Sequence, residues 1–239
     1  MRRLLALLLV VSAATAASGC SGVDAQKAQT LLDQSTTAMA GVKSVSFAMR
    51  MWVSGGPAGS DFTVLMHGGG YQKGKRAGES YATLSSSNVP GMGSVTVVVR
   101  HDTLYVKAGG SWTRIPAPAN RASADPLAGF DLTRYVTDVR VDEGVLVEGE
   151  RMDRITGVID TSAAVSGLLG MLGGAGGGIG DVADVLGDIR AVLYVSETTH
   201  LPMRTLVDMP MSIAGQKITM HIDLVITGVN KPVSIPSVG

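Results

Sequence analysis

An alternation of apolar and other side chains with a period of two begins at Ser44 and constrains the fold more than any other feature of the chain. The apolar members of this first segment are Val45, Phe47, Met49, Met51 and Val53. Successive side chains of a β-strand point to opposite faces of its sheet, so the pattern predicts a half-buried strand. The alternation returns at Phe62, Val64 and Met66 after a glycine-rich loop, which predicts that the two strands form a hairpin.

Strand-like segments recur along the rest of the chain at intervals of about eight to twelve residues. Turn-forming residues such as Gly109 and Gly110 separate them. The further predicted strands cover 79–85, 94–100, 103–108, 112–115, 144–148, 152–160, 190–197, 201–209 and 217–227. Short strands with turns at this spacing form antiparallel sheets, so the expected fold class is α+β, with one large curved antiparallel sheet that helices cover.

The segment before the first strand is predicted to be an amphipathic helix over 24–39. Asp24 is a suitable N-cap, and Gly41 ends the pattern. The residues of one face lie three and four positions apart and are Ala28, Leu31, Leu32, Ser35 and Met39. A second helix is predicted to begin at Asp125–Pro126, to run through Tyr135 and to lie across the sheet.

The segment 161–190 contains two apolar, helix-like pieces on either side of a glycine run at 173–180. The apolar residues of these pieces include Leu168, Leu169, Met171, Leu172, Val182, Val185, Leu186 and Ile189. Each glycine that is held in one conformation costs about 0.5 to 1 kcal/mol relative to alanine, so a rigid core would rarely keep such a run. We interpret the segment as two flaps on a hinge that form a mobile lid, and the alternative is a disordered surface insert.

The amino terminus has the layout of a secretory signal peptide. Arg2 and Arg3 precede an apolar run from Leu4 to Ala17, which is shorter than the roughly 18 to 20 residues that span a membrane. The small residues that follow end at Cys20, and this pattern resembles the bacterial lipobox, in which the cysteine is acylated and becomes the new amino terminus. The alternative is an ordinary secretory signal, which would leave an unpaired thiol in an exported protein.

The predicted domain organisation follows from that assignment. Residues 1–19 form a cleaved lipoprotein signal peptide, 20–23 a lipidated tether and 24–239 a single domain, with the glycine-rich flap at 161–190. Because Cys20 is the single cysteine of the chain, neither disulfides nor thiolate metal sites can stabilise that domain. Its stability must therefore come from buried apolar surface.

The charged residues exclude several classes of function. The precursor has 20 Lys and Arg against 20 Asp and Glu, and no basic block or stripe of the kind that binds nucleic acid. The four histidines, His67, His101, His200 and His221, lie in different predicted hairpins, so no metal site is expected. There is no Gly-x-Ser-x-Gly motif and no phosphate-binding loop, so we expect neither catalytic residues nor a cofactor.

Methionine is abundant among the apolar residues. The chain has 12 Met against 3 Phe and 2 Trp. Methionine is flexible and adapts to irregular space, which suits a deformable ligand such as an acyl chain. The alternative is that Met49, Met51 and Met66 belong to an ordinary filled core.

Two sequence stretches resemble the LppX/LprAFG lipoproteins of mycobacteria and related bacteria. The first is 194–204, a hairpin with Leu201–Pro202 at the start of its second strand, and the second is Asn230-Lys231-Pro232-Val233. The resemblance implies a LolA-like fold, in which a half-barrel sheet is closed by helices around a hydrophobic cavity. It also implies that the protein carries lipids or lipoglycans across the cell envelope.

The sequence thus predicts a non-enzymatic carrier that is anchored by Cys20 to the extracytoplasmic face of the cell membrane. An acylated lipid or lipoglycan is the expected partner, and an envelope transporter is a further candidate. The predicted cavity residues are Phe47, Met49, Met51, Phe62, Val64, Met66, Leu168, Leu169, Met171, Leu172, Val185 and Leu186. The main alternative is an envelope sensor or assembly lipoprotein that binds a protein through its apolar flaps, and an envelope hydrolase is a third.

Overall fold

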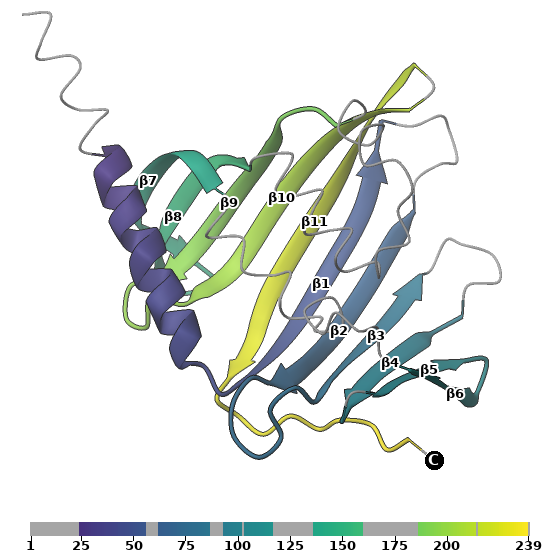
Figure 1. Cartoon of the computed structure of the whole chain (residues 1–239). Coiled ribbons are helices and arrows are strands. Elements are labelled where there is room, and N and C mark those ends of the chain that lie inside the picture. The colour runs from purple at the N-terminus through teal and green to yellow at the C-terminus, as the bar shows by residue number, and fades with distance from the viewer. Residues whose placement is uncertain are drawn as a thin grey trace, which may run out of the picture.

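The alternating segment forms β1 (Ser44–Ser54), which lies in the middle of one large antiparallel sheet in the computed structural model (Figure 1). The structure describes residues 24–55, 62–86, 93–101, 103–116, 136–159, 186–213 and 215–238. A helix at 24–41 precedes β1. The other strands are β2 (Thr63–Tyr71), β3 (Ser80–Ser86), β4 (Val95–Arg100), β5 (Thr103–Ala108), β6 (Ser111–Pro116), β7 (Val136–Val147), β8 (Glu150–Ile159), β9 (Ile189–Ser196), β10 (Pro202–Ile213) and β11 (Gln216–Val229).

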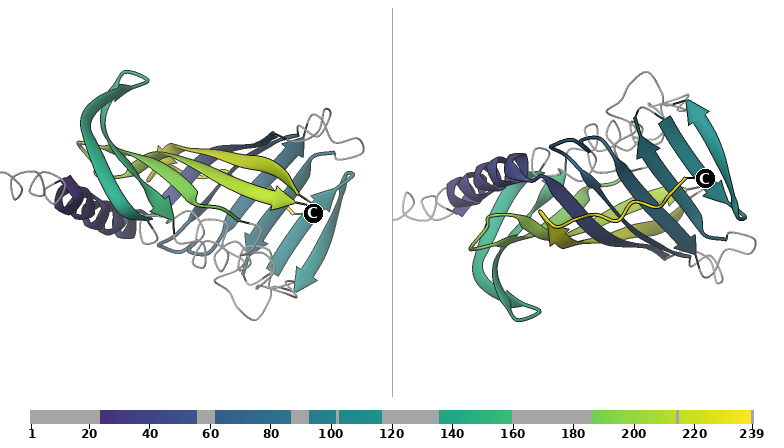
Figure 2. Two further views of the ribbon diagram at one scale, coloured as in Figure 1. Left: turned by 90° about the horizontal axis from the view of Figure 1, so that it is seen from above. Right: turned by 90° about the horizontal axis from the view of Figure 1, so that it is seen from below.

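The sheet consists of two meanders that meet at the centre. Its strand order is β6-β5-β4-β3-β2-β1-β11-β10-β9-β8-β7, so every strand except β1 and β11 pairs only with strands that adjoin it in the sequence. The single long-range pairing joins β1 to β11, with Val45 opposite Val229 and Ser54 opposite Thr219. The two halves of the chain therefore depend on this one ladder to form a continuous sheet, which is twisted and curved (Figure 2).

The helix packs on one face of the sheet near the β7 end (Figures 1 and 2). Its Ala28, Leu31 and Leu32 belong to a buried cluster with residues of β7 to β10, among them Ile155 and Leu193. Burial of each large aliphatic side chain stabilises the fold by about 1.5 to 3 kcal/mol. The predicted apolar face of this helix is therefore the face that holds it on the sheet.

A second buried cluster continues from the end of the helix onto β1. Val42, Val45, Phe47 and Met49 are buried in it, and Ala38 of the helix packs against it. These β1 side chains therefore lie on the same side of the sheet as the helix, and we call this side the helix face.

The carboxyl-terminal segment 230–238 lies on the opposite side, which we call the tail face. It runs along the lower ends of β1 to β4 in the view of Figure 1. Gly68 lies opposite Phe47 and so belongs to the helix face, which places its neighbour Gly69 on the tail face. A Cβ atom at Gly69 would lie 3.1 Å from Cγ1 of Val233. Arg100 donates hydrogen bonds to the carbonyl oxygens of Ile235 and Pro236 at 3.3 and 3.2 Å. The segment is thus held across several strands.

The strand prediction is wrong at β7, which begins at Val136 and not at residue 144. Register shifts in its pairing with β8 lie between Thr137 and Arg140 and between Asp142 and Val145. Asp138 and Gly144 have positive φ angles of 50° and 61°, as expected of bulge residues. Because each bulge moves the alternation by one residue, the period of two that marks the other strands is broken here.

The prediction of a helix that reaches Ile189 is also wrong in its last residues. Leu186 forms an isolated bridge with Met211, and Ile189 is the first residue of β9. The N–H of Gly187 donates to the carbonyl of Pro210 at 2.8 Å, so this segment extends the sheet ladder. The rest of the proposed flaps, the glycine run and the helix predicted at 125–135 lie outside the described residues.

The described part of the chain is mostly β, with one helix and eleven strands. The prediction of a single large antiparallel sheet is confirmed, and of the predicted helices the described residues contain the one that begins at Asp24. The helix covers the β7 to β10 end of its face, and its last residues reach β1.

Candidate functional site

The candidate site lies on the helix face at the centre of the sheet. Met49 of β1 lies opposite Met66 of β2, and Met51 lies opposite Val64. On the other side of β1, Met51 lies opposite Ile222 of β11. Directly opposed residues share a face, so these side chains form one continuous apolar surface across three strands.

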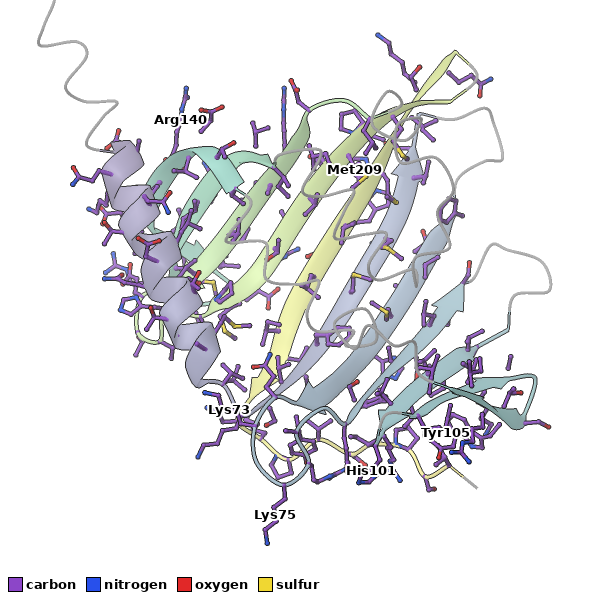
Figure 3. All side chains as sticks on the ribbon, in the orientation of Figure 1. Lys73, Lys75, His101, Tyr105, Arg140 and Met209 are labelled. Carbon is purple, nitrogen blue, oxygen red and sulfur yellow. The ribbon has the colours of Figure 1, made fainter. Side chains whose placement is uncertain are left out.

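The apolar surface continues onto β10. Met209 lies opposite Met220 of β11, and Val207 lies opposite Ile222. Figure 3 labels Met209 on β10, and this residue belongs to the buried cluster that includes the helix. We call the whole surface the methionine face, and its residues are Met49, Met51, Val64, Met66, Val207, Met209, Met211, Met220 and Ile222.

Burial is uneven across this face. Phe47, Met49, Val64 and Met209 are at most 9% exposed, whereas Met51, Met66, Met211 and Met220 are only partly buried. The Phe47 ring has room because Gly68 has no side chain, and a Cβ atom there would lie 2.8 Å from Cζ of the ring. The face is therefore partly filled core, in which four incompletely covered methionines lie beside buried side chains.

The structure brings together most of the described residues that the sequence predicts for the site. Met49, Met51, Val64 and Met66 lie side by side, and Phe47 adjoins them in the buried cluster. The carbonyl of Phe62, one residue before β2, accepts a hydrogen bond from the N–H of Val53 at 3.3 Å. That these residues line a ligand cavity stays a prediction.

The predicted flap residues are a different case. Leu186 packs against the buried cluster under the helix and bridges to Met211. The other five, Leu168, Leu169, Met171, Leu172 and Val185, lie outside the described residues.

Sequence reasoning missed the contribution of β10 and β11. The alternation Met203, Thr205, Val207, Met209 and Met211 is as regular as that of β1. It could have identified the second half of the face, had the pairing of β1 with β11 been foreseen. That pairing joins residues about 170 positions apart, and no local pattern specifies it.

A shallow depression lies elsewhere, between the exposed side of the helix and the β9–β10 turn. Its lining is Thr30, Asp33, Gln34, Thr37, Ala38 and His200. Most of these side chains are polar and none belongs to the methionine face, so this depression does not correspond to the predicted cavity.

The tail face carries a hydrogen-bonded row with the residue types of a hydrolase triad. Ser54 and His221 Nε2 are 2.7 Å apart, and His221 Nδ1 lies 2.6 Å from a carboxylate oxygen of Asp208. The imidazole stacks on Trp52 with ring centroids 4.9 Å apart. The Asp208 side chain is 59% exposed, whereas the aspartate of a catalytic triad is buried. The row therefore links β1, β11 and β10 as a structural network.

Two arginine–carboxylate pairs also lie on strands of this sheet. Arg204 donates two hydrogen bonds to the carboxylate of Asp223, at 2.9 and 2.8 Å, and Arg154 donates two to one oxygen of Asp142, at 2.9 and 2.6 Å. The hydrogen bond to Asp223 raises the pKa of the Arg204 guanidinium, and that to Asp142 raises the pKa of Arg154. Both arginines stay charged, so the pairs stabilise cross-strand contacts and offer no proton for catalysis.

Within the described ranges, no cluster of three His, Cys, Asp or Glu side chains is arranged to hold a metal ion. In the same part of the chain, no helix is both long and apolar enough to span a membrane.

No protein-family model matches the chain, and no curated protein matches its sequence. Solved structures do match. LprF from Mycobacterium bovis superposes with a TM-score of 0.56 at 16% identity, over 90% of this chain and 98% of LprF. The Mycobacterium tuberculosis lipoprotein LppX superposes with a TM-score of 0.51 at 18% identity, over 88% of this chain and 99% of LppX.

A LolA superfamily protein from Nitrosomonas europaea matches more weakly, with a TM-score of 0.33 at 9% identity, over 87% of this chain and 94% of that protein. Since the LprF and LppX matches cover nearly the whole of both chains, they are matches of the complete sheet and not of a shared hairpin. The chain has the fold of the mycobacterial lipoproteins LprF and LppX.

Proposed function

We propose that this protein is a membrane-anchored carrier that holds the acyl chains of a lipid or lipoglycan against the methionine face. The observation that carries the proposal is the incomplete burial of Met51, Met66, Met211 and Met220 at the centre of a large sheet. An apolar partner that covers these side chains would bind favourably, because their apolar surface would be removed from water.

The chemistry of the face suits an acyl chain. Each methylene group that leaves water contributes about 0.8 kcal/mol, so a long chain needs only a continuous apolar surface to bind firmly. Methionine adapts to chains of different length and unsaturation because three torsions of its side chain are free to rotate. The likeness of the fold to LprF and LppX supports an envelope lipoprotein, and the proposal assigns no catalytic residue.

The test compares one tryptophan substitution on each face of the sheet. Met51→Trp adds bulk to the partly buried section of the methionine face and is expected to lower the amount of co-purified lipid per protein at least twofold. Leu65→Trp is the matched control, because Leu65 neighbours Val64 on β2 but is 51% exposed and points to the tail face. Lipid is measured by organic extraction and mass spectrometry after purification from a mycobacterial host.

Thermal unfolding of both variants separates the two interpretations of the face. Retained lipid in Met51→Trp, or a large fall in its Tm with no lipid in the wild type, contradicts the carrier. A wild type without lipid that co-purifies with one protein would favour the sensor alternative.

A further inference from the structure

Exposed lysines from three separate segments meet at the lower edge of the sheet. Lys43 follows the helix, Lys73 and Lys75 lie in the β2–β3 turn, and Lys231 begins the carboxyl-terminal segment. We call this group the lysine rim. Figure 3 shows Lys73 and Lys75 at this edge, with Arg140 at the other end of the molecule.

Backbone hydrogen bonds hold the rim together. The carbonyl of Lys43 accepts hydrogen bonds from the N–H groups of Gln72 and Lys73, at 2.8 and 3.2 Å. The N–H of Lys43 donates to Oδ1 of Asn230 at 2.7 Å. The position of the lysines is thus fixed by the fold, although 43, 73 and 231 are far apart in the sequence.

The rim has almost no compensating negative charge. Among residues 40–46, 71–81 and 228–238, Glu79 is the single carboxylate, and it pairs with Arg76 at 2.7 Å. In the described part of the chain, Lys43, Lys73, Lys75 and Lys231 form no ion pair with a carboxylate. Lys73 instead donates a hydrogen bond to the carbonyl of Ala40 at the end of the helix. Three lysine charges therefore face solvent without a partner.

The β7–β8 edge of the sheet has the reverse charge. The segment 136–159 carries six carboxylates against three arginines. Among the described residues, the charge therefore differs in sign between this edge and the rim at the ends of the central strands. Such a distribution orients a protein in the field of a charged surface.

We infer that the lysine rim docks the protein on the anionic headgroups of a phospholipid membrane, where the proposed carrier loads or releases its lipid. The role of the docking in lipid loading or release rests on the proposed function. The docking itself does not require a bound lipid. Flexible, strongly hydrated ammonium groups suit a fluid array of phosphate headgroups, which demands no fixed geometry. Each lysine close to such a surface strengthens binding about fivefold, and the effect fades over a Debye length.

The anchor predicted at Cys20 is compatible with this docking. The helix of 24–41 is about 27 Å long at 1.5 Å per residue, and the rim lies at its far end. The rim therefore lies within about 27 Å of the end of the helix that adjoins the anchor.

The experiment uses the chain from residue 20 onward with Cys20→Ser, so that no acyl group contributes to binding. Co-sedimentation is measured with vesicles of phosphatidylcholine containing 30% phosphatidylglycerol, and with pure phosphatidylcholine. We expect binding to the anionic vesicles only, with a marked loss between 50 and 500 mM salt.

The test variant is Lys43→Gln, Lys75→Gln, Lys231→Gln, which leaves Lys73 in place because it bonds to Ala40. It is expected to weaken binding to the anionic vesicles at least tenfold. The matched control is Arg140→Gln, Arg190→Gln, Lys217→Gln, which removes the same charge from exposed positions outside the rim. This control is expected to change binding less than threefold.

Equal weakening in the two triple variants would show that net charge acts and not the rim, and this would overturn the inference. Equal binding to the two vesicle types would overturn it as well, because apolar contact would then dominate. Absence of binding to either vesicle excludes membrane docking and leaves an acidic protein as the partner of the rim. Lipid extracted from the same protein samples reports on the carrier proposal separately, so failure of one is distinguishable from failure of the other.

Discussion

The hydroxyl of Tyr71 makes two hydrogen bonds to the backbone of Val233, one to its carbonyl oxygen at 3.1 Å and one from its N–H at 2.9 Å. One side chain at the end of β2 thus satisfies both backbone groups of a buried residue in the carboxyl-terminal segment. The same hydroxyl accepts a hydrogen bond from Arg76 at 3.2 Å, and the guanidinium lies over the tyrosine ring. This contact ties the segment to the part of the sheet that carries the lysine rim.

Tyr71→Phe is expected to destabilise the protein by about 1 to 3 kcal/mol, because it leaves the backbone groups of Val233 without these partners. Chemical denaturation followed by circular dichroism measures the change. Tyr105→Phe is the control, since Tyr105 is half-buried on the same half of the sheet and its hydroxyl has no hydrogen-bond partner among the described residues. If both variants lose the same free energy of unfolding, the double hydrogen bond does not anchor the segment.

Gly68→Ala is expected to cost about 1 to 3 kcal/mol, the usual cost of overpacking. A Cβ atom at this position would lie 2.4 Å from the carbonyl oxygen of Tyr81 and 2.8 Å from the Phe47 ring. Gly41→Ala provides the comparison, since nothing lies within 4 Å of its Cβ position. Equal midpoints of urea unfolding for the two variants would contradict the close packing of Phe47 on β2.

The two arginine pairs are expected to differ in their effect on stability. Arg204→Met removes the partner of Asp223, whose side chain is 20% exposed, and should cost about 1.5 to 3 kcal/mol. Arg154→Met removes the partner of Asp142, which is 55% exposed, and should cost less than about 1 kcal/mol. Thermal unfolding of both variants checks the order, and the opposite order would show that burial does not decide the strength of these pairs.

Cys20→Ser is expected to release the protein from the membrane fraction or to leave an uncleaved precursor. This follows from the lipobox pattern that ends at Cys20. Fractionation and the intact mass of the mature chain measure both outcomes. Normal processing together with unchanged, firm membrane attachment of the variant would contradict the anchor.

Much of the sheet was predictable because its strands keep a strict period of two. The apolar parity of 45–53 correctly identified the side of β1 that faces the helix. β7 was not predictable in the same way, because the bulges at Asp138 and Gly144 shift its alternation twice within a few residues. Local patterns thus specify strands but fail where the ladder is irregular.

The candidate site was half predictable for a related reason. The first hairpin supplied Met49, Met51 and Met66, but their continuation onto β10 and β11 depends on a pairing between distant parts of the chain. The lysine rim was not predictable at all, because its members are single lysines in three separate segments. The fold brings them together, and the sequence shows no basic stripe.

Native mass spectrometry is the most direct test of whether the methionine face binds acyl chains. The protein is produced with its own signal peptide in a mycobacterial host and extracted in a mild detergent. We expect a mass above that of the acylated chain, and collisional activation should release a lipid of defined mass. A population that consists entirely of the unliganded mass would contradict binding of acyl chains by this face.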